Sequence, residues 1–246
     1  MDGEHAELVR LLWGPHPKPA RGPRPTLDLD RIARAGIEIA DSEGLGEVSM
    51  QRVAARLGVT KMALYRYVPG KAELVALMVE TAIGPCPPSA EGRPVGWREQ
   101  LEEWARQLLT LFLQHSWVLA ATVGPRVQGP GELSWLERAV SALDGTGLNG
   151  AERMDAAVLL VGHVRGITQQ AHAAGGPAGN PEAQLGAILG DLMRSHGESF
   201  PALTAAFASA VESDGQDQAW EFGLQRILDG LAALIDQRRV DHRRAG

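Results

Sequence analysis

Residues 60–67 of this sequence, TKMALYRY, gather hydrogen-bond donors around small or flexible apolar side chains. Hydroxyl, ammonium, guanidinium and phenol groups can donate to DNA phosphates or to the edges of base pairs. Met62 and Ala63 can lie against thymine methyl groups. This combination favours recognition of the DNA major groove. Spacing alone leaves open a helical hairpin in an ordinary α-domain, with the same side chains merely on its surface.

Two short helices joined by a tight turn must hold these side chains in place. Ser49 and Thr60 can each cap a helix start, because their hydroxyl oxygens accept hydrogen bonds from backbone amides. Gly58 lies between them and suits the positive φ of a tight turn. The predicted helices cover residues 49–57, 60–67 and 70–83. The first two of them form a helix-turn-helix.

A longer helix is predicted before this pair. Apolar residues recur at spacings of three and four from Leu29 onward, with Asp28 as an N-cap and Gly44 as a C-terminal stop. The preceding segment to Pro25 contains five prolines, which disfavour regular helix, so residues 1–25 are predicted to form a flexible arm. Arg21 and Arg24 of this arm are either contacts to the adjacent minor groove or incidental charges of a tail.

Beyond a proline- and glycine-rich break at residues 84–96, the helical period returns. No segment alternates with period two for long enough to predict a strand. We therefore expect an all-α protein, with an N-terminal three-helix helix-turn-helix domain over residues 26–83 and a larger helical domain over 97–239. The amphipathic segments of the larger domain begin with a long apolar stripe from Trp97 to Trp117 and continue at residues 132–143, 151–173, 182–196, 201–211 and 217–237.

The charge distribution follows this division. The formal net charge of −6 over 246 residues argues against a nucleic-acid binder if it is averaged over the whole chain. Residues 16–75, however, carry ten Lys and Arg against seven Asp and Glu, a net of +3. Residues 76–236 carry nine Arg against nineteen acidic residues, a net of −10. The acidic total thus describes the larger domain and does not exclude DNA binding.

Other chemistries find little support in the sequence. Gly145, Gly147 and Gly150 match the dinucleotide-binding fingerprint by letter, but no predicted strand precedes them, and Asn149 fits better as a helix cap. The seven histidines lack metal-ligand spacing, and Cys86 has no neighbouring base. We expect no catalytic residues, no metal and no cofactor. With no apolar run near ~20 residues and no signal peptide, we expect a cytoplasmic protein without a membrane partner.

The segment from Leu29 to Ile83 resembles the DNA-binding domain of TetR-family transcriptional regulators. The run LGVTKMALYRYVPGKAEL carries the resemblance most specifically. Arg66 stands where the tetracycline repressor has an aromatic residue, so its base preference is not carried over. Gly36 stands in mid-helix where the family has a better helix former. A glycine there destabilises the helix by about 1 kcal/mol relative to alanine. The resemblance implies that the operator is contacted by Thr60, Lys61, Met62, Ala63, Tyr65 and Tyr67, with Arg66 beside them, and that Gln51 and Lys71 hold flanking DNA.

The larger domain resembles the effector domains of tetracycline-repressor type through WREQLEEWARQLL, HSWVLAATVGPR, VGHVRGITQQ and WEFGLQRILDGLAAL. This resemblance implies a homodimer formed by a four-helix bundle, here from residues 151–173 and 217–237, with Gly162 and Gly166 allowing close packing. It also implies a pocket for a small-molecule effector. Each candidate for its lining is explained equally well as a core or surface residue. They are Trp104, Phe112, His115, Trp117, Arg126, Trp135, His163, Arg165, Gln169 and His172.

These inferences together predict a repressor that a small molecule releases from a palindromic double-stranded DNA operator. The alternative is a helical small-molecule-binding protein whose DNA binding is constitutive or degenerate.

Overall fold

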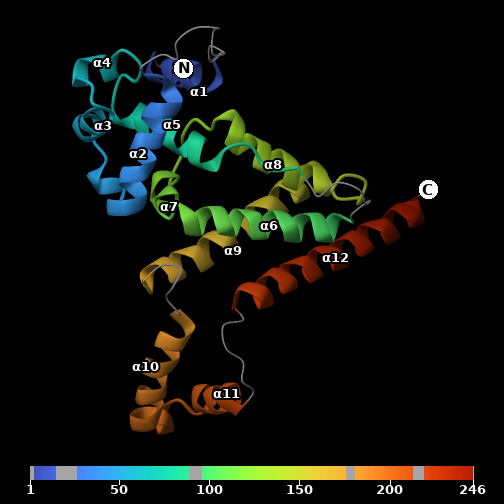
Figure 1. The fold of residues 1–246 in the computed structure, drawn as a ribbon. Coiled ribbons are helices and arrows are strands. Elements are labelled where there is room, and N and C mark those ends of the chain that lie inside the picture. The colour runs from blue at the N-terminus through green and yellow to red at the C-terminus, as the bar shows by residue number, and fades with distance from the viewer. Residues whose placement is uncertain (1–2, 15–26, 89–95, 176–180, 213–218, 246) are drawn as a thin grey trace. The chain divides into compact units, whose positions relative to one another are not determined.

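The computed structural model of the protein describes residues 3–14, 27–88, 96–175, 181–212 and 219–245. Every regular element in these ranges is a helix, which confirms the predicted all-α class (Figure 1). The chain forms two compact units, Met1–Trp104 with Thr110–Leu143, and Ala105–Leu109 with Asp144–Gly246. None of the described helices is long and apolar enough to span a membrane.

The first unit holds the helix-turn-helix and the helices packed around it. Helix α2 ends at Gly44, which has a φ of 94°, and a 3-10 turn at Leu45–Glu47 leads on to the pair α3 and α4. Helix α5 packs against α2, and α7 and α8 pack against α5. The helices of this unit are α1 (Gly3–Trp13), α2 (Leu29–Glu43), α3 (Met50–Leu57), α4 (Lys61–Tyr65), α5 (Lys71–Ile83), α7 (Trp117–Ala121), α8 (Pro130–Ala142) and both ends of α6 (Trp97–Gln114), whose middle, Ala105–Leu109, belongs to the second unit.

Helix α1 corrects the prediction of a flexible arm over residues 1–25 for its own part of that segment, Gly3–Trp13. The five prolines all lie at residue 15 or later, so they do not interrupt the segment Gly3–Trp13. Leu12 on this helix is buried, and α1 packs against α5. Arg21 and Arg24 lie outside the described residues.

The local signals that predict the helix-turn-helix are confirmed. The side chains of Asp28, Ser49 and Thr60 each accept a hydrogen bond from the amide three residues later. Gly58 ends α3 in the left-handed conformation, with a φ of 66°. Helix α4 is shorter than the predicted 60–67, because Arg66 already serves as its C-cap.

Gly36 has a packing role that the sequence does not reveal. A Cβ at this position would lie 2.6 Å from Sδ of Met78, which is fully buried on α5. The missing side chain therefore lets α2 and α5 approach closely. An alanine here would require Met78 to shift, which gives a packing reason for glycine at a position where it costs a helix about 1 kcal/mol relative to alanine.

The second unit is built on two long helices. Helix α9 (Gly150–Ala173) packs against α12 (Ala219–Ala245), whose buried stripe is Leu224, Leu228, Leu231 and Ile235. Asn149 and Glu152 form a capping box at the start of α9, which confirms the cap rather than the dinucleotide fingerprint. In the sequence between α9 and α12, the chain forms a helical hairpin. It consists of α10 (Pro181–His196), a 3-10 turn (Gly197–Ser199) and α11 (Pro201–Glu212). Helix α12 continues beyond the predicted end at 237, and Arg238 there pairs with Glu152.

Candidate nucleic-acid interface

Helix α4 exposes three of its five side chains to solvent, those of Lys61, Met62 and Tyr65. Leu64 is its one buried residue and anchors it to the domain, while the side chain of Met62 is 75% exposed. The Thr60 hydroxyl accepts the Ala63 amide at 3.2 Å, which sets the start of the helix. Exposed side chains surround this start on three elements: Gln51 on α3, Thr60, Lys61, Met62, Tyr65, Arg66 and Tyr67 on and beside α4, and Lys71 at the first position of α5.

Two of these side chains are ordered by each other. The ammonium nitrogen of Lys61 lies 5.5 Å from the centre of the Tyr65 ring, one helical turn away. Such a cation–π contact at an exposed site is worth about 0.5–1 kcal/mol. It places the phenol and the ammonium on one face of α4 before any DNA is bound. Ala63, by contrast, is half-buried and offers only its methyl group.

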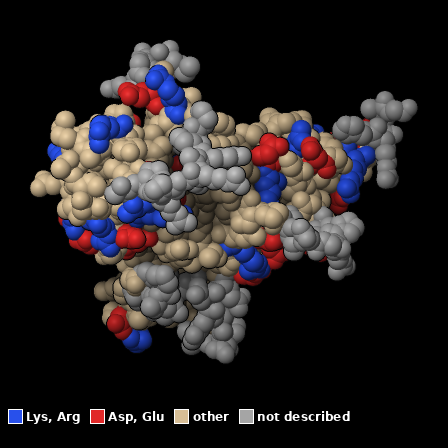
Figure 2. All heavy atoms as spheres, turned by 45° about the horizontal axis from the view of Figure 1, so that its top comes forward, with Lys and Arg blue, Asp and Glu red and all other residues tan. Residues whose placement is uncertain are grey.

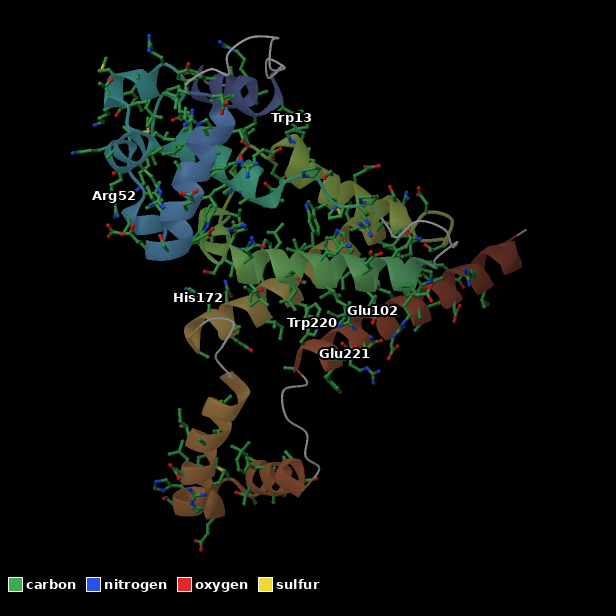
Figure 3. The ribbon with its side chains drawn as sticks, viewed as in Figure 1. Trp13, Arg52, Glu102, His172, Trp220 and Glu221 are labelled. Atoms are coloured by element: carbon green, nitrogen blue, oxygen red, sulfur yellow. The ribbon has the colours of Figure 1, made fainter. Side chains whose placement is uncertain are left out.

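The arginines of α3 are engaged in anchoring that helix. Arg52 donates to Glu43 at 2.5 Å and to Glu47 at 2.6 Å, and Arg56 donates to Glu38 at 2.8 Å (Figure 3). In contrast, Lys61, Arg66 and Lys71 have no carboxylate partner within the described part of the chain. Figure 2 shows Lys and Arg side chains spread among uncharged residues rather than gathered into one patch. The candidate surface therefore combines three cations that have no carboxylate partner among the described residues with exposed side chains that can donate hydrogen bonds.

The Arg52–Glu43 pair gives a pH-dependent prediction. The hydrogen bond that Arg52 donates holds the pKa of Glu43 below its ordinary value. The pair therefore stabilises the folded state near neutral pH, and this stabilisation is lost as pH falls and Glu43 becomes protonated. Glu43→Gln should therefore lower the denaturant midpoint at pH 7, and this difference should vanish at about pH 3. Chemical denaturation at both pH values measures it. A difference that persists in acid would contradict the assignment.

Six of the candidate effector-site residues lie in the first unit, where each has an intramolecular role. Trp104 and Trp135 are buried edge to face, and the Trp104 indole donates to the Trp135 carbonyl at 2.9 Å. Phe112 is buried in the same unit. Arg126 pairs with Glu132.

His115 and Trp117, the other two, converge on one carboxylate that the sequence does not single out. Nδ1 of His115 lies 2.8 Å from Oδ1 of Asp41, and the Trp117 indole donates to the same oxygen at 2.7 Å. Asp41 lies on α2, more than 70 residues away in sequence, so no local spacing could have revealed it.

The other four candidates lie on α9 in the second unit. The ring of His163 stacks on that of Trp220, with centroids 5.3 Å apart, and its Nε2 lies 3.0 Å from the Trp220 carbonyl oxygen; Figure 3 labels Trp220. Arg165 is half-buried, whereas Gln169 and His172 are exposed near the end of the helix. Among the described residues, no group of three His, Cys, Asp or Glu side chains is arranged to hold a metal ion.

Comparison with known proteins agrees with this arrangement. Residues 32–78 match the family described as bacterial regulatory proteins, tetR family, and residues 90–235 match the tetracyclin repressor-like C-terminal domain. The chain is 38% identical over 252 residues to the HTH-type transcriptional repressor DrrR1 of Streptomyces coeruleorubidus, covering 96% of this chain and 89% of that protein.

Two crystal structures of ActR from Streptomyces coelicolor are also similar. Apo ActR has a TM-score of 0.71 and 28% identity, over 87% of this chain and 99% of that one. ActR in complex with actinorhodin has a TM-score of 0.70 and 27% identity, over 84% of this chain and 96% of that one. The chain therefore belongs to the tetR family of bacterial regulatory proteins and is a DNA-binding transcriptional regulator.

Proposed function

We propose that the protein is a homodimeric repressor that binds a palindromic operator through α4 and is released from it by a small-molecule effector. The observation that carries the proposal is the exposed surface of α4, where Lys61 and Arg66 lack acidic partners among the described residues and Met62 is bare to solvent. A helix of five residues offers little contact area, so two copies on a two-fold site are needed for specific binding.

A stripe on α9 supports the dimer. Met154, Val158, Gly162 and Gly166 recur every four residues, and the side chain of Val158 is 64% exposed. A Cβ added at either glycine would meet nothing within 4 Å, so a partner helix could approach closely there. Phe222 on α12 is 65% exposed. We propose that α9 and α12 of each protomer form the predicted four-helix bundle.

The neighbour ActR supports a small-molecule effector, because one of its structures is a complex with actinorhodin. We propose that the effector of this chain binds to the part that matches the tetracyclin repressor-like C-terminal domain, residues 90–235. Gln169 and His172 are its most accessible candidate contacts, since both are exposed on α9. The remaining eight candidates stay proposals, with the intramolecular contacts described above.

Binding to the DNA that precedes its own gene tests the proposal. By fluorescence anisotropy, a labelled duplex of that region should bind, and a scrambled duplex of equal length should compete about 10³-fold less effectively. Equal competition by both duplexes would contradict specific repression. Actinorhodin is the first effector probe: release of the duplex supports regulation, and tight binding without release favours the alternative of constitutive DNA binding.

A further inference from the structure

The first turn of α8 is capped by a carboxylate from α5. Oε1 of Glu80 accepts the Gly131 amide at 2.6 Å, and Oε2 accepts the Glu132 amide at 3.4 Å. Gly129, the N-cap residue, has no side chain that could do this. Free amides at a helix start need such an acceptor, and a carboxylate also complements the helix dipole. Glu80 thus supplies a cap from 51 residues away in sequence.

Glycines beside this cap leave room for the end of α5. A Cβ at Gly131 would lie 2.8 Å from Oε1 of Glu80 and 2.9 Å from the Gly84 carbonyl, and a Cβ at Gly129 would overlap the same carboxylate. Beyond the cap, the Trp135 indole donates to the Gly84 carbonyl at 3.2 Å. Two glycines and two hydrogen-bonding side chains therefore join the last turns of α5 to α8. We refer to residues 128–132 as the α8 start.

Helix α1, near the N-terminus, also contacts the α8 start. The indole nitrogen of Trp13 donates to the Gln128 carbonyl at 3.0 Å, and the side chain of Gln128 donates to Glu132 at 2.9 Å. Leu12, beside Trp13, is buried, and α1 packs against α5. Both α1 and α5 therefore contact the α8 start, and they also contact each other.

We propose that Glu80 and Trp13 are positioning residues for DNA binding. They hold the C-terminal end of α5 against the α8 start. Lys71 lies at the other end of α5, in its first turn, and only a short segment separates it from α4. Because α5 packs against α2, α2 against α3 and α3 against α4, a rotation of α5 about its C-terminal end would move Lys71 and α4 together. The α1–Glu80 junction fixes this rotation in the DNA-competent state. This inference rests on the proposed function.

Substitutions at position 80 test the proposal in the full-length protein. Glu80→Ala should weaken binding of the labelled upstream duplex about tenfold. This factor corresponds to the free energy of one charge-assisted hydrogen bond. Glu80→Gln keeps one oxygen acceptor and should stay within about threefold of wild type. Trp13→Phe, which removes only the indole donor, should weaken binding by about threefold. The titrations are run well below each variant's Tm, so that every molecule is folded.

Glu99→Ala is the matched control. Glu99 accepts the Gly96 amide at 3.2 Å and so caps α6 from within its own helix. This variant should lose a helix cap and keep its DNA affinity. If Glu80→Ala keeps wild-type affinity, or if Glu99→Ala loses as much, the proposal is overturned. If Glu80→Ala does not fold, unchanged affinity in Trp13→Phe overturns it.

Hydrogen exchange separates this proposal from the function on which it rests. Glu80→Ala should speed exchange of amides in residues 71–77, the half of α5 far from the junction, whereas Glu99→Ala should not. If wild-type protein binds no duplex specifically, the proposed function fails, and this exchange comparison still decides the positioning role. Unchanged protection of residues 71–77 in Glu80→Ala would overturn it.

Discussion

Tyr65→Ala is expected to weaken operator binding by about 10²- to 10⁴-fold. Tyr65 is exposed on α4 and its ring lies beneath the Lys61 ammonium, so the substitution removes the phenol that we propose contacts a base and frees the Lys61 side chain. Removing one specific base interaction costs about 1–3 kcal/mol, and in a dimer the substitution removes it twice. Anisotropy titrations of wild type and variant with the upstream duplex, at about 0.15 M salt, measure the change.

Two further variants show which part of the interaction matters. Tyr65→Phe keeps the ring beside Lys61 and removes only the phenol oxygen, so its affinity should fall between wild type and Tyr65→Ala. Lys71→Ala should weaken binding to all sequences alike and lower the slope of log K against log salt by about 2 per dimer. An equal loss of affinity on operator and scrambled duplexes for Tyr65→Ala would contradict a base-reading role.

The helix-turn-helix could be predicted closely because its signals are local. Asp28, Ser49 and Thr60 cap amides only three residues away, and Gly58 adopts the positive φ that its turn requires. Hydrogen bonds over this range follow from residue type and spacing, with little influence from the rest of the fold. The exposed set on α4 follows as well, since one buried residue, Leu64, fixes which face points inward.

The interactions that position this domain are long-range, and spacing gives no sign of them. Asp41 meets Trp117 76 residues later, and Glu80 meets Gly131 51 residues later. Gly36 looks like a defect in a helix until its close neighbour Met78 is known. Composition conceals helix α1, because five prolines dominate residues 1–25 although all of them follow the helix.

The effector-domain candidates show a different limit. An indole or imidazole on an amphipathic helix is an equally good core residue or ligand contact, and sequence cannot tell which. The Trp104 indole donates to the backbone carbonyl of Trp135 and packs edge to face against its ring, and His163 stacks on Trp220. These side chains have partners within the protein, so an effector that uses them must share or displace those partners.

Val158→Glu is expected to convert the protein to a monomer at micromolar concentration and to reduce operator binding to the level of a scrambled duplex. Val158 is well exposed on α9, so glutamate is tolerated in the monomer. In a two-fold bundle the same patch faces itself, and each protomer then brings one unpaired carboxylate into an apolar interface. Sedimentation velocity measures the fraction of dimer. Anisotropy measures the affinity for the operator, which should fall about 10³-fold or more.

Val123→Glu is the matched control, because Val123 is also strongly exposed but lies in the segment between α7 and α8 and so belongs to neither α9 nor α12. It should leave both dimer and DNA affinity unchanged. Salt gives an independent check. Dimerisation through apolar side chains should persist as salt rises, whereas operator binding should weaken because salt screens the attraction between the protein's cations and the DNA phosphates. A Val158→Glu protein that remains dimeric, or binds its operator as a monomer with wild-type affinity, would place the dimer interface elsewhere or make it unnecessary.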